Sequence, residues 1–262
     1  MSKTLILYAG NIGLCATINS IVYAIDYCEK NNMKLRFCPK YGLYGDVTKF
    51  IDFGVECIKV LPPGYAMNPH PEYEFAHPYW DGPNNTQALF DKIVLADIPF
   101  ERQRAIALTF KPLVPIPELP CEVFDAVHIR RGDAFTVPQG CEYHVTNDYL
   151  EKTSCDDVFI MSDDHRVLDE VSSAKKIHHM IPADADGWYA VLGSITKPTE
   201  QTIFAFQPQH KKDENTIRLI QEMYIAAKSQ KFIHTFSNVS RFIKLIHRDP
   251  SQCIDLQNTI SK

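Results

Sequence analysis

The chain has 262 residues, of which 45% are apolar and 23% are charged, and its formal net charge is −5. These values are typical of a globular protein with one large domain or two small ones, and the length allows a core that needs no disulfide or metal staples. The negative net charge excludes a global basic field for nucleic acid, so we expect no nucleic-acid partner and only a local anion site.

The first sixty residues predict an α/β unit. Residues 4–10 (TLILYAG) indicate a buried strand, and residues 11–32 carry apolar side chains at helical spacing up to a stop at Asn31-Asn32. The segments 34–38 (KLRFC) and 55–61 (VECIKVL) indicate two further strands. A strand, a glycine-containing loop, a helix and a second strand form the opening of a Rossmann-like unit.

The middle of the chain holds a predicted loop and a predicted domain boundary. Residues 64–86 contain four prolines, three tyrosines and a tryptophan without periodicity, which indicates a long surface loop with either a functional or a merely structural role. A helix is expected around residues 101–110. The segment 111–120 (KPLVPIPELP) has four prolines and predicts a stiff connector, so we expect domains over 1–112 and 121–262 with a linker at 113–120.

After this connector the alternation of strands and helices restarts. Strands are indicated at 124–130 (FDAVHIR), 157–164 (DVFIMSDD), 175–181 (KKIHHMI) and 231–237 (KFIHTFS). Helices are indicated at 146–154 with Thr146 as a cap, at 165–173, at 213–229 and at 238–248. This order predicts a second α/β domain.

Three of these strands end in polar clusters. The clusters are His128 to Asp133, Ser162-Asp163-Asp164, and Thr235 to Asn238. If the second half forms one parallel sheet, they share its carboxyl edge, where ligands of open α/β sheets bind. The planar guanidinium groups of Arg130 and Arg131 suit phosphate oxygens, and a helix that starts near Ser237 offers free N–H groups to an anion. The pattern predicts a site for a ligand that carries a diphosphate.

Two other interpretations of the arginines are open at this point. Arg130 or Arg131 can form an internal ion pair with Asp133. The tripeptide RGD at 131–133 is also an integrin-type sequence, but that role requires exposure outside the cell and the chain shows no export signal.

The segment VHIRRGDAF (127–135) resembles the first signature, H-x-R-R-x-D, of fucosyltransferases with the GT-B fold, which include α-1,6-fucosyltransferases and protein O-fucosyltransferases. VFIMSDDHRVLDE (158–170) and AKSQKFIHTFSNVSRFIKLI (227–246) are similar to the second and third signatures. The α-1,2-fucosyltransferases also match HIRRGD and SDD, although their third block differs from TFSNVSRF. The clear resemblance covers 121–247, and YAGNIGLCATINSIVYAI (8–25) is a looser match to the glycine loop and first helix of these enzymes.

The resemblance implies a site for a nucleotide-sugar donor. Arg130, Arg131 and Ser237 would hold the diphosphate. His128 and Glu222 would read the guanine base, whose adjacent N–H donors suit a carboxylate. The other residues implied at this site are Gly10, Gly13, Asp163, Asp164, Thr235, Phe236 and Asn238.

The resemblance is less complete on the acceptor side. The position of the glutamate proposed as the general base in the α-1,6 enzymes falls on Gly140, and Glu142 can take over the proton transfer, with Asp133 and His144 as alternatives. We expect Arg131, Asp133 and Glu142 to be catalytic, with Asp133 also orienting the arginines or the sugar. The lysine that follows the motif aspartate in the family is Ala134 here.

Metal and cofactor sites are not expected. Asp184-Ala185-Asp186 matches the D-x-D motif of metal-dependent GT-A transferases, but the following glycine favours a solvated turn. The adjacent His178 and His179 cannot both point to one face of a strand, which argues against a metal role for the pair.

The cysteines and the sequons favour a reducing compartment. Eight cysteines occur with no C-x-x-C pair and no zinc-ligand spacing, which indicates reduced and mostly buried thiols. The first apolar run is too short for a signal peptide or a membrane span. A glycan on the sequon at Asn238 would block the implied donor site, so a cytoplasmic chain is expected.

The sequence therefore predicts an α/β protein with the GT-B fold, with two Rossmann-like domains and a cleft between them. Domain 1–112 is expected on the acceptor side, and domain 121–262 is expected to bind the donor. The expected reaction is inverting and metal-independent transfer of fucose from GDP-fucose to a glycan or oligosaccharide acceptor. Another GDP-sugar, or a non-catalytic nucleotide- or glycan-binding module, stays open. We expect a bacterial or viral enzyme without the anchor of animal members, as a monomer or homodimer.

Overall fold

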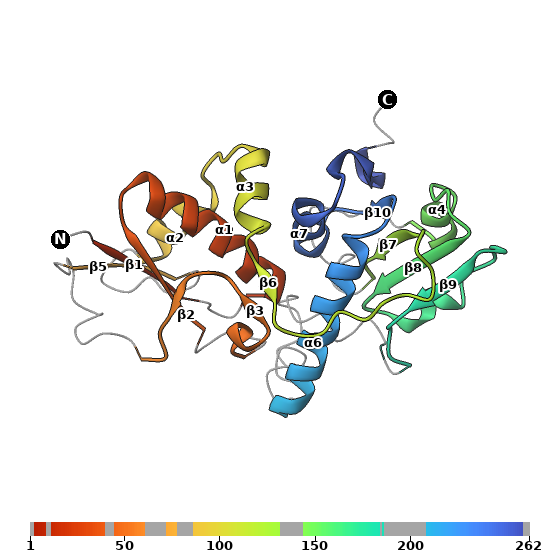
Figure 1. The fold of residues 1–262 in the computed structure, drawn as a ribbon, viewed down its shortest axis with the longest axis horizontal. Helices are drawn as coiled ribbons and strands as arrows, with labels where there is room; N and C mark the ends of the chain where they lie inside the picture. Colours follow the sequence, from red (N-terminus) through yellow and green to blue (C-terminus); the bar gives the residue numbers. More distant parts are fainter. Residues whose placement is uncertain are drawn as a thin grey trace. The chain divides into compact units, whose positions relative to one another are not determined.

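The computed structural model describes residues 3–8, 12–39, 45–60, 72–77, 86–131, 144–183, 185 and 208–258. The chain divides into two compact units. The first comprises Met1–Pro115 with Lys212–Ile217, and the second comprises Ile116–Lys211 with Arg218–Lys262. Each unit contains a parallel β-sheet accompanied by helices (Figure 1).

The main sheet of the first unit has the strand order β4-β2-β1-β5, and all of its pairs are parallel. Its strands are β1 (Thr4–Tyr8), β2 (Lys34–Cys38), β4 (Glu56–Cys57) and β5 (Tyr73–Ala76). The predicted strands at 4–10 and 34–38 are confirmed, whereas only two residues of the predicted strand at 55–61 pair with a neighbour. Leu5, Ile6 and Leu7 of the central strand β1 are buried, so both faces of the sheet are covered there.

Helix α1 (Leu14–Lys30) connects β1 with β2 and stops where the sequence predicts. Asn31 is the C-cap, and Asn32 adopts a left-handed conformation with φ of 51°. The N–H group of Met33 then donates to the carbonyl oxygen of Cys28 at 2.8 Å. Asparagine tolerates this backbone better than most side chains, so the pair terminates the helix.

The prediction of one long loop over 64–86 is wrong for its centre. Residues 73–76 form β5, which pairs in parallel with β1 from Thr4↔Tyr73 to Leu7↔Ala76. Tyr73 and Phe75 alternate with Glu74, which is the period-2 pattern of a strand. The prolines and aromatic residues around them hide this pattern in the sequence. Apart from residues 72–77 and Thr86, the predicted loop lies outside the described residues.

Further elements are described in the first unit. They include the short helix η1 (Val47–Lys49), the antiparallel pair β3 (Ile51–Asp52) and β6 (Lys111–Pro112), and the helices α2 (Thr86–Val94) and α3 (Phe100–Ala107). The guanidinium of Arg102 on α3 binds the buried carboxylate of Asp26 on α1 at 3.1 Å. The rings of Phe53 and Phe110 meet edge to face at 5.1 Å between centroids. These contacts fasten α3 and β6 to the core.

The second unit contains a five-stranded parallel sheet in the order β11-β10-β7-β8-β9. Its strands are β7 (Asp125–Ile129), β8 (Asp157–Ser162), β9 (Lys176–His179), β10 (Phe232–His234) and β11 (Cys253–Asp255). Its described helices are α4 (Thr146–Leu150), η3 (His165–Leu168), α7 (Asn238–Ile246), η5 (Pro250–Gln252), η6 (Leu256–Asn258) and α6 (Gln209–Ala226), of which Lys212–Ile217 belong to the first unit. The sequence predicts the first four strands, but it does not predict β11, and the helix expected at 165–173 is only the short η3.

The two faces of this sheet carry different side chains. One face holds an apolar cluster from β7, β8 and β10 together with Tyr149 and Leu150 of α4 and Val167 of η3. Strand register places His128, Phe159 and His234 on the other face. The chain runs outward from β7 to β9 and then returns to β10 and β11 on the other side of β7. Because parallel crossovers are right-handed, α6 and α7 cover the face opposite α4.

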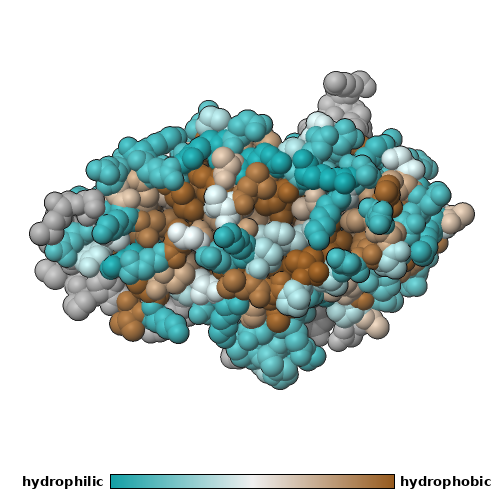
Figure 2. All heavy atoms as spheres, viewed as in Figure 1, coloured by the Kyte–Doolittle hydropathy of each residue, from teal (hydrophilic) through white to brown (hydrophobic). Residues whose placement is uncertain are grey.

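Hydrophilic side chains cover most of the surface visible in Figure 2, with apolar patches between them. The amino end of α6, at the bottom of the view, is hydrophilic, and Gln209 to Lys211 are exposed there. None of the helices in the described ranges combines the length and the apolar character that a bilayer span requires.

Candidate functional site

The three polar clusters predicted from the sequence follow neighbouring strands of the second unit. β10, β7 and β8 are adjacent, His234 pairs with His128, and Ile129 pairs with Ser162. The direction of chain progress reverses between β7 and β10, which makes this gap the topological switch point of the sheet. Ligands of open α/β sheets bind at the carboxyl edge of such a point.

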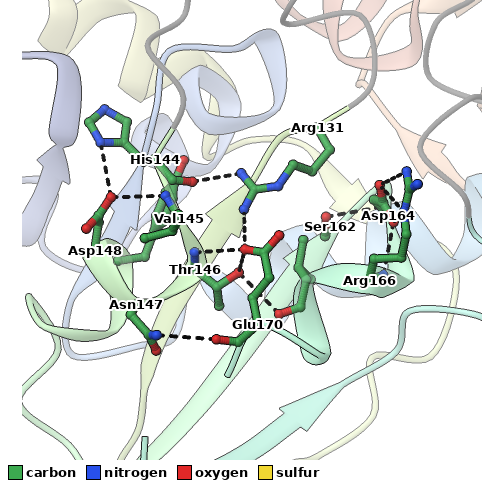
Figure 3. Close-up of polar contacts among 12 residues, drawn as sticks. Arg131, His144, Val145, Thr146, Asn147, Asp148, Ser162, Asp164, Arg166 and Glu170 are labelled. Atoms are coloured by element: carbon green, nitrogen blue, oxygen red, sulfur yellow. Dashed lines mark hydrogen bonds and ion pairs between the residues drawn. The ribbon is translucent and has the colours of Figure 1, made fainter. Parts of the chain in front are cut away.

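Hydrogen bonds to other residues of the chain fix the Arg131 side chain at this edge of the sheet (Figure 3). Its Nη1 donates to the carbonyl oxygen of His144 at 2.9 Å, and its Nη2 donates to Oε2 of Glu170 at 2.7 Å. The backbone N–H of Arg131 donates to Oδ1 of Asp163 at 2.9 Å. The side chain is 8% exposed. Arg131 therefore forms an internal ion pair with Glu170, whereas the pairing with Asp133 that the sequence leaves open lies outside the described residues.

Glu170 joins three segments through one carboxylate oxygen. Besides Arg131, its Oε2 accepts from the N–H of Thr146 at 3.0 Å and from the hydroxyl of Thr146 at 2.7 Å. Burial raises the pKa of Glu170, but the hydrogen bonds from Thr146 and the charge of Arg131 outweigh it and lower the pKa below its ordinary value. The carboxylate therefore stays ionised and ties the start of α4 to the end of β7.

Thr146 does not cap α4 as the sequence predicts. The N-cap is Val145, whose N–H donates to Oδ2 of Asp148 at 3.0 Å. The hydroxyl of Thr146 contacts Glu170 and the carbonyl oxygen of Val167 at 3.2 Å instead. The Thr146 hydroxyl therefore serves the contact with the segment around η3, and the Asp148 carboxylate serves the N-cap residue.

The aspartates after β8 shape the loop, and Figure 3 shows the contacts of Asp164 with Arg166. Asp164 caps η3 by accepting from the N–H of Arg166 at 2.9 Å, and its other oxygen pairs with the Arg166 guanidinium at 2.5 Å. Burial raises the pKa of Asp164, and the bonds from Arg166 more than offset this and lower it. Asp163 accepts from the backbone of Arg131. Both carboxylates thus have partners within the protein.

His128 is a buried and neutral side chain next to the switch point. Burial, followed by the charges of Arg130 and His234, lowers its pKa to about 3. Its Nδ1 atom, enclosed among the described residues, has no hydrogen-bond partner among them. Arg130 is partly exposed beside it. A buried polar atom without a partner is costly, so this nitrogen is suited to contact a ligand.

Glu222 has a second buried polar atom that lacks a hydrogen-bond partner among the described residues. It lies on α6, which covers the sheet face that carries His128, and the residue is 3% exposed. Burial raises its pKa to about 7, against the opposing effect of Arg218. Within the described part of the chain, its Oε1 has no hydrogen-bond partner. A carboxylate in this environment is destabilised until a donor reaches it.

Helix α7 begins at the switch point, and hydrogen bonds between Ser237 and Ser240 close its first turn. Ser237 is its N-cap and accepts from the N–H of Ser240 at 2.9 Å, while the N–H of Ser237 donates to the Ser240 hydroxyl at 2.9 Å. That hydroxyl also donates to the carbonyl oxygen of Thr235 at 2.9 Å. Phe236 and Asn238 are exposed beside the helix start. The helix end carries partial positive charge and favours an anion.

Other predicted site residues lie elsewhere. Gly13 is the N-cap of α1 in the first unit, with φ of −61°, and a Cβ atom there would meet no heavy atom within 4 Å. Backbone conformation and packing therefore do not demand glycine at this position. Gly10, Asp133 and Glu142 lie outside the described residues, as do Ala134, Gly140, Asp184 and Asp186.

The sequence does not single out Glu170 and Thr146 as members of this edge. Glu170 lies 39 residues from Arg131, and nothing in the local pattern of either segment links the two. His144, one of the options for the general base, is buried and contributes its carbonyl oxygen to Arg131. Its Nε2, judged against the described residues, has no hydrogen-bond partner.

No known protein-family profile matches the sequence, and no curated protein sequence matches it. Solved structures match along almost the whole chain. The fucosyltransferase NodZ from Bradyrhizobium has a TM-score of 0.60 at 14% identity and covers 98% of this chain and 97% of its own. NodZ α-1,6-fucosyltransferase soaked with GDP-fucose gives 0.57 at 15% identity over 94% of this chain, and the form co-crystallised with GDP gives 0.58 at 16% over 94%, each covering 93% of the NodZ chain.

The chain has the GT-B fold of a fucosyltransferase. This confirms the resemblance and the fold class that the motifs indicate. The match also extends over the first half of the chain, where the sequence offers only a looser similarity. At 14–16% identity the likeness concerns the fold, so the chemistry of the site has to be argued from this chain's own residues.

Proposed function

We propose that the chain is an inverting, metal-independent glycosyltransferase that transfers fucose from GDP-fucose to a glycan acceptor. The observation that carries this proposal is the pair of buried polar atoms, Nδ1 of His128 and Oε1 of Glu222, that find no partner among the described residues. They accompany Arg130 and the start of α7 in a fold shared with NodZ, whose solved structures include forms with GDP and GDP-fucose.

Guanine fits the two atoms chemically. Its Watson–Crick edge presents adjacent N–H donors, which a carboxylate accepts in a bidentate way. Glu222 gains a partner and its charge becomes favourable, so binding removes the cost of the buried carboxylate. His128 is neutral because of its low pKa and can either accept or donate one hydrogen bond, according to its tautomer. Uracil lacks this pair of adjacent donors, which supports a guanine nucleotide.

We assign the diphosphate to Arg130, to the N–H groups at the start of α7, and to the hydroxyl of Ser237. Each charge-assisted hydrogen bond contributes about 1.5–3 kcal/mol, and bonds that strengthen as the diphosphate leaves accelerate the reaction. Arg131 is the positioning residue in this scheme because Glu170 and the His144 carbonyl hold its guanidinium. This revises the catalytic role that the family resemblance implies for Arg131.

The proposal does without a metal ion on the following ground. Asp163 accepts from the Arg131 backbone, and Asp164 caps η3 and pairs with Arg166. Asp163 and Asp164 therefore support the loop, and in this scheme Arg130 and the start of α7 neutralise the diphosphate.

The chemical step is a direct displacement. A base takes the proton of the acceptor hydroxyl, the oxygen bonds to the anomeric carbon on the face opposite GDP, and the bond from that carbon to the diphosphate breaks. We propose Glu142 as the base, assisted by Asp133, with His144 as the alternative. The pH profile of the transfer rate distinguishes them, because substitution of the true base removes one limb of the profile.

Ala134 favours a second candidate. It stands where the family has a lysine next to the motif aspartate, so the sugar or acceptor contacts differ at this point. A GDP-sugar other than GDP-fucose would keep the base and diphosphate contacts and change only these. A non-catalytic nucleotide- or glycan-binding module would likewise keep the donor contacts but transfer no sugar. We further propose a cytoplasmic enzyme of bacterial or viral type, active as a monomer or homodimer.

A donor and acceptor screen tests the function. Labelled GDP-fucose, GDP-mannose and UDP-sugars are each offered to the full chain with a panel of defined glycans in the presence of EDTA. The proposal predicts transfer from GDP-fucose with inversion at the anomeric carbon. Transfer from GDP-mannose alone would support the second candidate. Transfer only from a UDP-sugar, or only with added divalent metal, would contradict the proposal, and GDP binding without any transfer would support the non-catalytic module.

A further inference from the structure

A second group of chemically active side chains lies in the second unit, apart from the switch point. Cys121 follows the proline-rich linker, Asp157 is the first residue of β8, and His178 belongs to β9. The Nε2 atom of His178 lies 2.5 Å from Oδ1 of Asp157 and 3.8 Å from Sγ of Cys121. All three ligand atoms lie within 4.8 Å of one another. The cluster therefore gathers sulfur, nitrogen and oxygen from three separate segments.

The arrangement differs from a cysteine nucleophile with a histidine base. In such a relay one ring nitrogen faces the thiol and the other faces the carboxylate. Here the same nitrogen of His178 faces both the Cys121 sulfur and the Asp157 oxygen. Three potential ligand atoms thus converge on one point, which is the geometry of a metal site.

The spacing suits a small tetrahedral ion. Ligand atoms about 2.0–2.3 Å from zinc at tetrahedral angles are separated by about 3.3–3.8 Å. The distance between Sγ of Cys121 and Nε2 of His178 already has this length. The contact between His178 and Asp157 is a hydrogen bond, and it would open by about 1 Å when an ion replaces the proton between them.

We propose that Cys121, Asp157 and His178 form a binding site for a divalent transition metal of the zinc type, with water as the fourth ligand. A thiolate, an imidazole and a single carboxylate suit zinc, whereas magnesium and calcium require more oxygen ligands. The ion would clamp the segment that enters the second unit to β8 and β9. Its role would be structural, and the site is independent of the proposed donor site.

Lys176 competes with the metal. Its Nζ lies 3.3 Å from Oδ1 of Asp157, and its side chain is 63% exposed, so it can move into solvent. Metal binding therefore displaces Lys176 and releases the Cys121 thiol proton to solvent.

A cobalt titration tests the site. The full chain, reduced and stripped of metal with a chelator, is titrated with Co²⁺ and then with competing Zn²⁺. One Co²⁺ per chain should bind with a thiolate-to-cobalt charge-transfer band and tetrahedral d–d bands, and Zn²⁺ should displace it. Cys121→Ser should abolish the charge-transfer band, and His178→Gln and Asp157→Asn should each weaken binding by about tenfold or more. Lys176→Met should bind more tightly than the wild type.

Matched controls decide the assignment. Cys155→Ser and His179→Gln remove a neighbouring thiol and imidazole and should bind Co²⁺ like the wild type. The proposal is overturned if the wild type shows no thiolate band, if the band persists in Cys121→Ser, or if the two controls weaken binding as much as the ligand variants. Far-UV circular dichroism verifies that each variant is folded. His178→Gln retains the thiol, so a weakened band in this variant tests the site if Cys121→Ser fails to fold.

Discussion

Arg130 and Arg131 are adjacent in the sequence but differ in burial and in the role that we propose for each. Arg131 is buried against Glu170 and the His144 carbonyl oxygen, whereas Arg130 is partly exposed next to His128. Their side chains leave the end of β7 in different directions because successive residues of an extended chain alternate. The buried arginine fastens the loop, and Arg130 is the one that we propose to bind an anion.

The arginine pair gives the first prediction. Arg131→Ala should lower the free energy of unfolding by about 2–4 kcal/mol, between the values for exposed and for buried ion pairs, because it leaves the Glu170 carboxylate without its cation. Arg130→Ala should change stability by about 1 kcal/mol or less but weaken GDP binding by about 10- to 100-fold. Urea unfolding and calorimetry measure the two effects. If Arg131→Ala is as stable as the wild type and has lost GDP binding, the division of roles is wrong.

Glu222 gives a prediction with a defined pH dependence. Its pKa is about 7 when folded against 4.5 when unfolded, so the folded state binds the extra proton between these values. Stability from this group is therefore present at low pH and lost as pH rises through about 7. As pH rises from about 5 to about 8, the free energy of unfolding of Glu222→Gln should increase by about 2–3 kcal/mol relative to that of the wild type. At the higher pH, the GDP affinity of this variant should be about 10- to 100-fold below that of the wild type.

Urea unfolding at the two pH values and GDP calorimetry check this prediction. His128 titrates in both proteins, so its effect cancels in the comparison. A Glu222→Gln variant whose stability follows that of the wild type at every pH, or which binds GDP normally, would contradict the role of the buried carboxylate.

At the scale of elements, the start of α7 combines a helix cap with the anion site that we propose. Ser237→Ala should cost about 1 kcal/mol because the Ser240 N–H loses its acceptor. Ser237→Asp should restore the cap to within about 0.5 kcal/mol, yet it places a negative charge where the diphosphate is proposed to lie. We therefore expect Ser237→Asp to unfold like the wild type and to bind GDP more weakly than Ser237→Ala. Equal GDP affinity of Ser237→Asp and the wild type would exclude the helix start from the site.

The elements predicted from sequence are those with a strong local pattern. β2 occupies 34–38 as predicted, and α1 ends at its two asparagines. β5 escapes notice because only four residues pair, amid prolines and aromatics, and β11 because its three residues gain their stability from β10. The helix expected at 165–173 is only the short η3, which Asp164 caps, while the Glu170 side chain beyond it binds Thr146 and Arg131.

The same limit applies to the sites. The polar clusters at strand ends are visible in the sequence, and a parallel sheet is enough to bring them to one edge. The Glu170 network and the Cys121, Asp157 and His178 cluster cannot be seen, because their members come from segments 39 and 57 residues apart. Only the strand order brings His178 next to Asp157.

At the scale of the whole molecule, the two proposed sites respond differently to chelation. EDTA should lower the melting temperature by about 2–4 °C for each kcal/mol of metal-binding free energy, while the initial rate of transfer well below that temperature stays unchanged. In Cys121→Ser the melting temperature should not respond to EDTA. Differential scanning calorimetry and rate measurements on the same samples separate the effects. A rate that falls with EDTA at low temperature would place a metal in the reaction itself.

The most direct test of the central claim is calorimetric titration of the full chain with GDP, GDP-fucose and UDP in the presence of EDTA. We predict one site per chain for GDP and for GDP-fucose, no comparable binding of UDP, and loss of GDP affinity in both Arg130→Ala and Glu222→Gln. Absence of GDP binding at millimolar concentration, or equal binding of GDP and UDP, would contradict it.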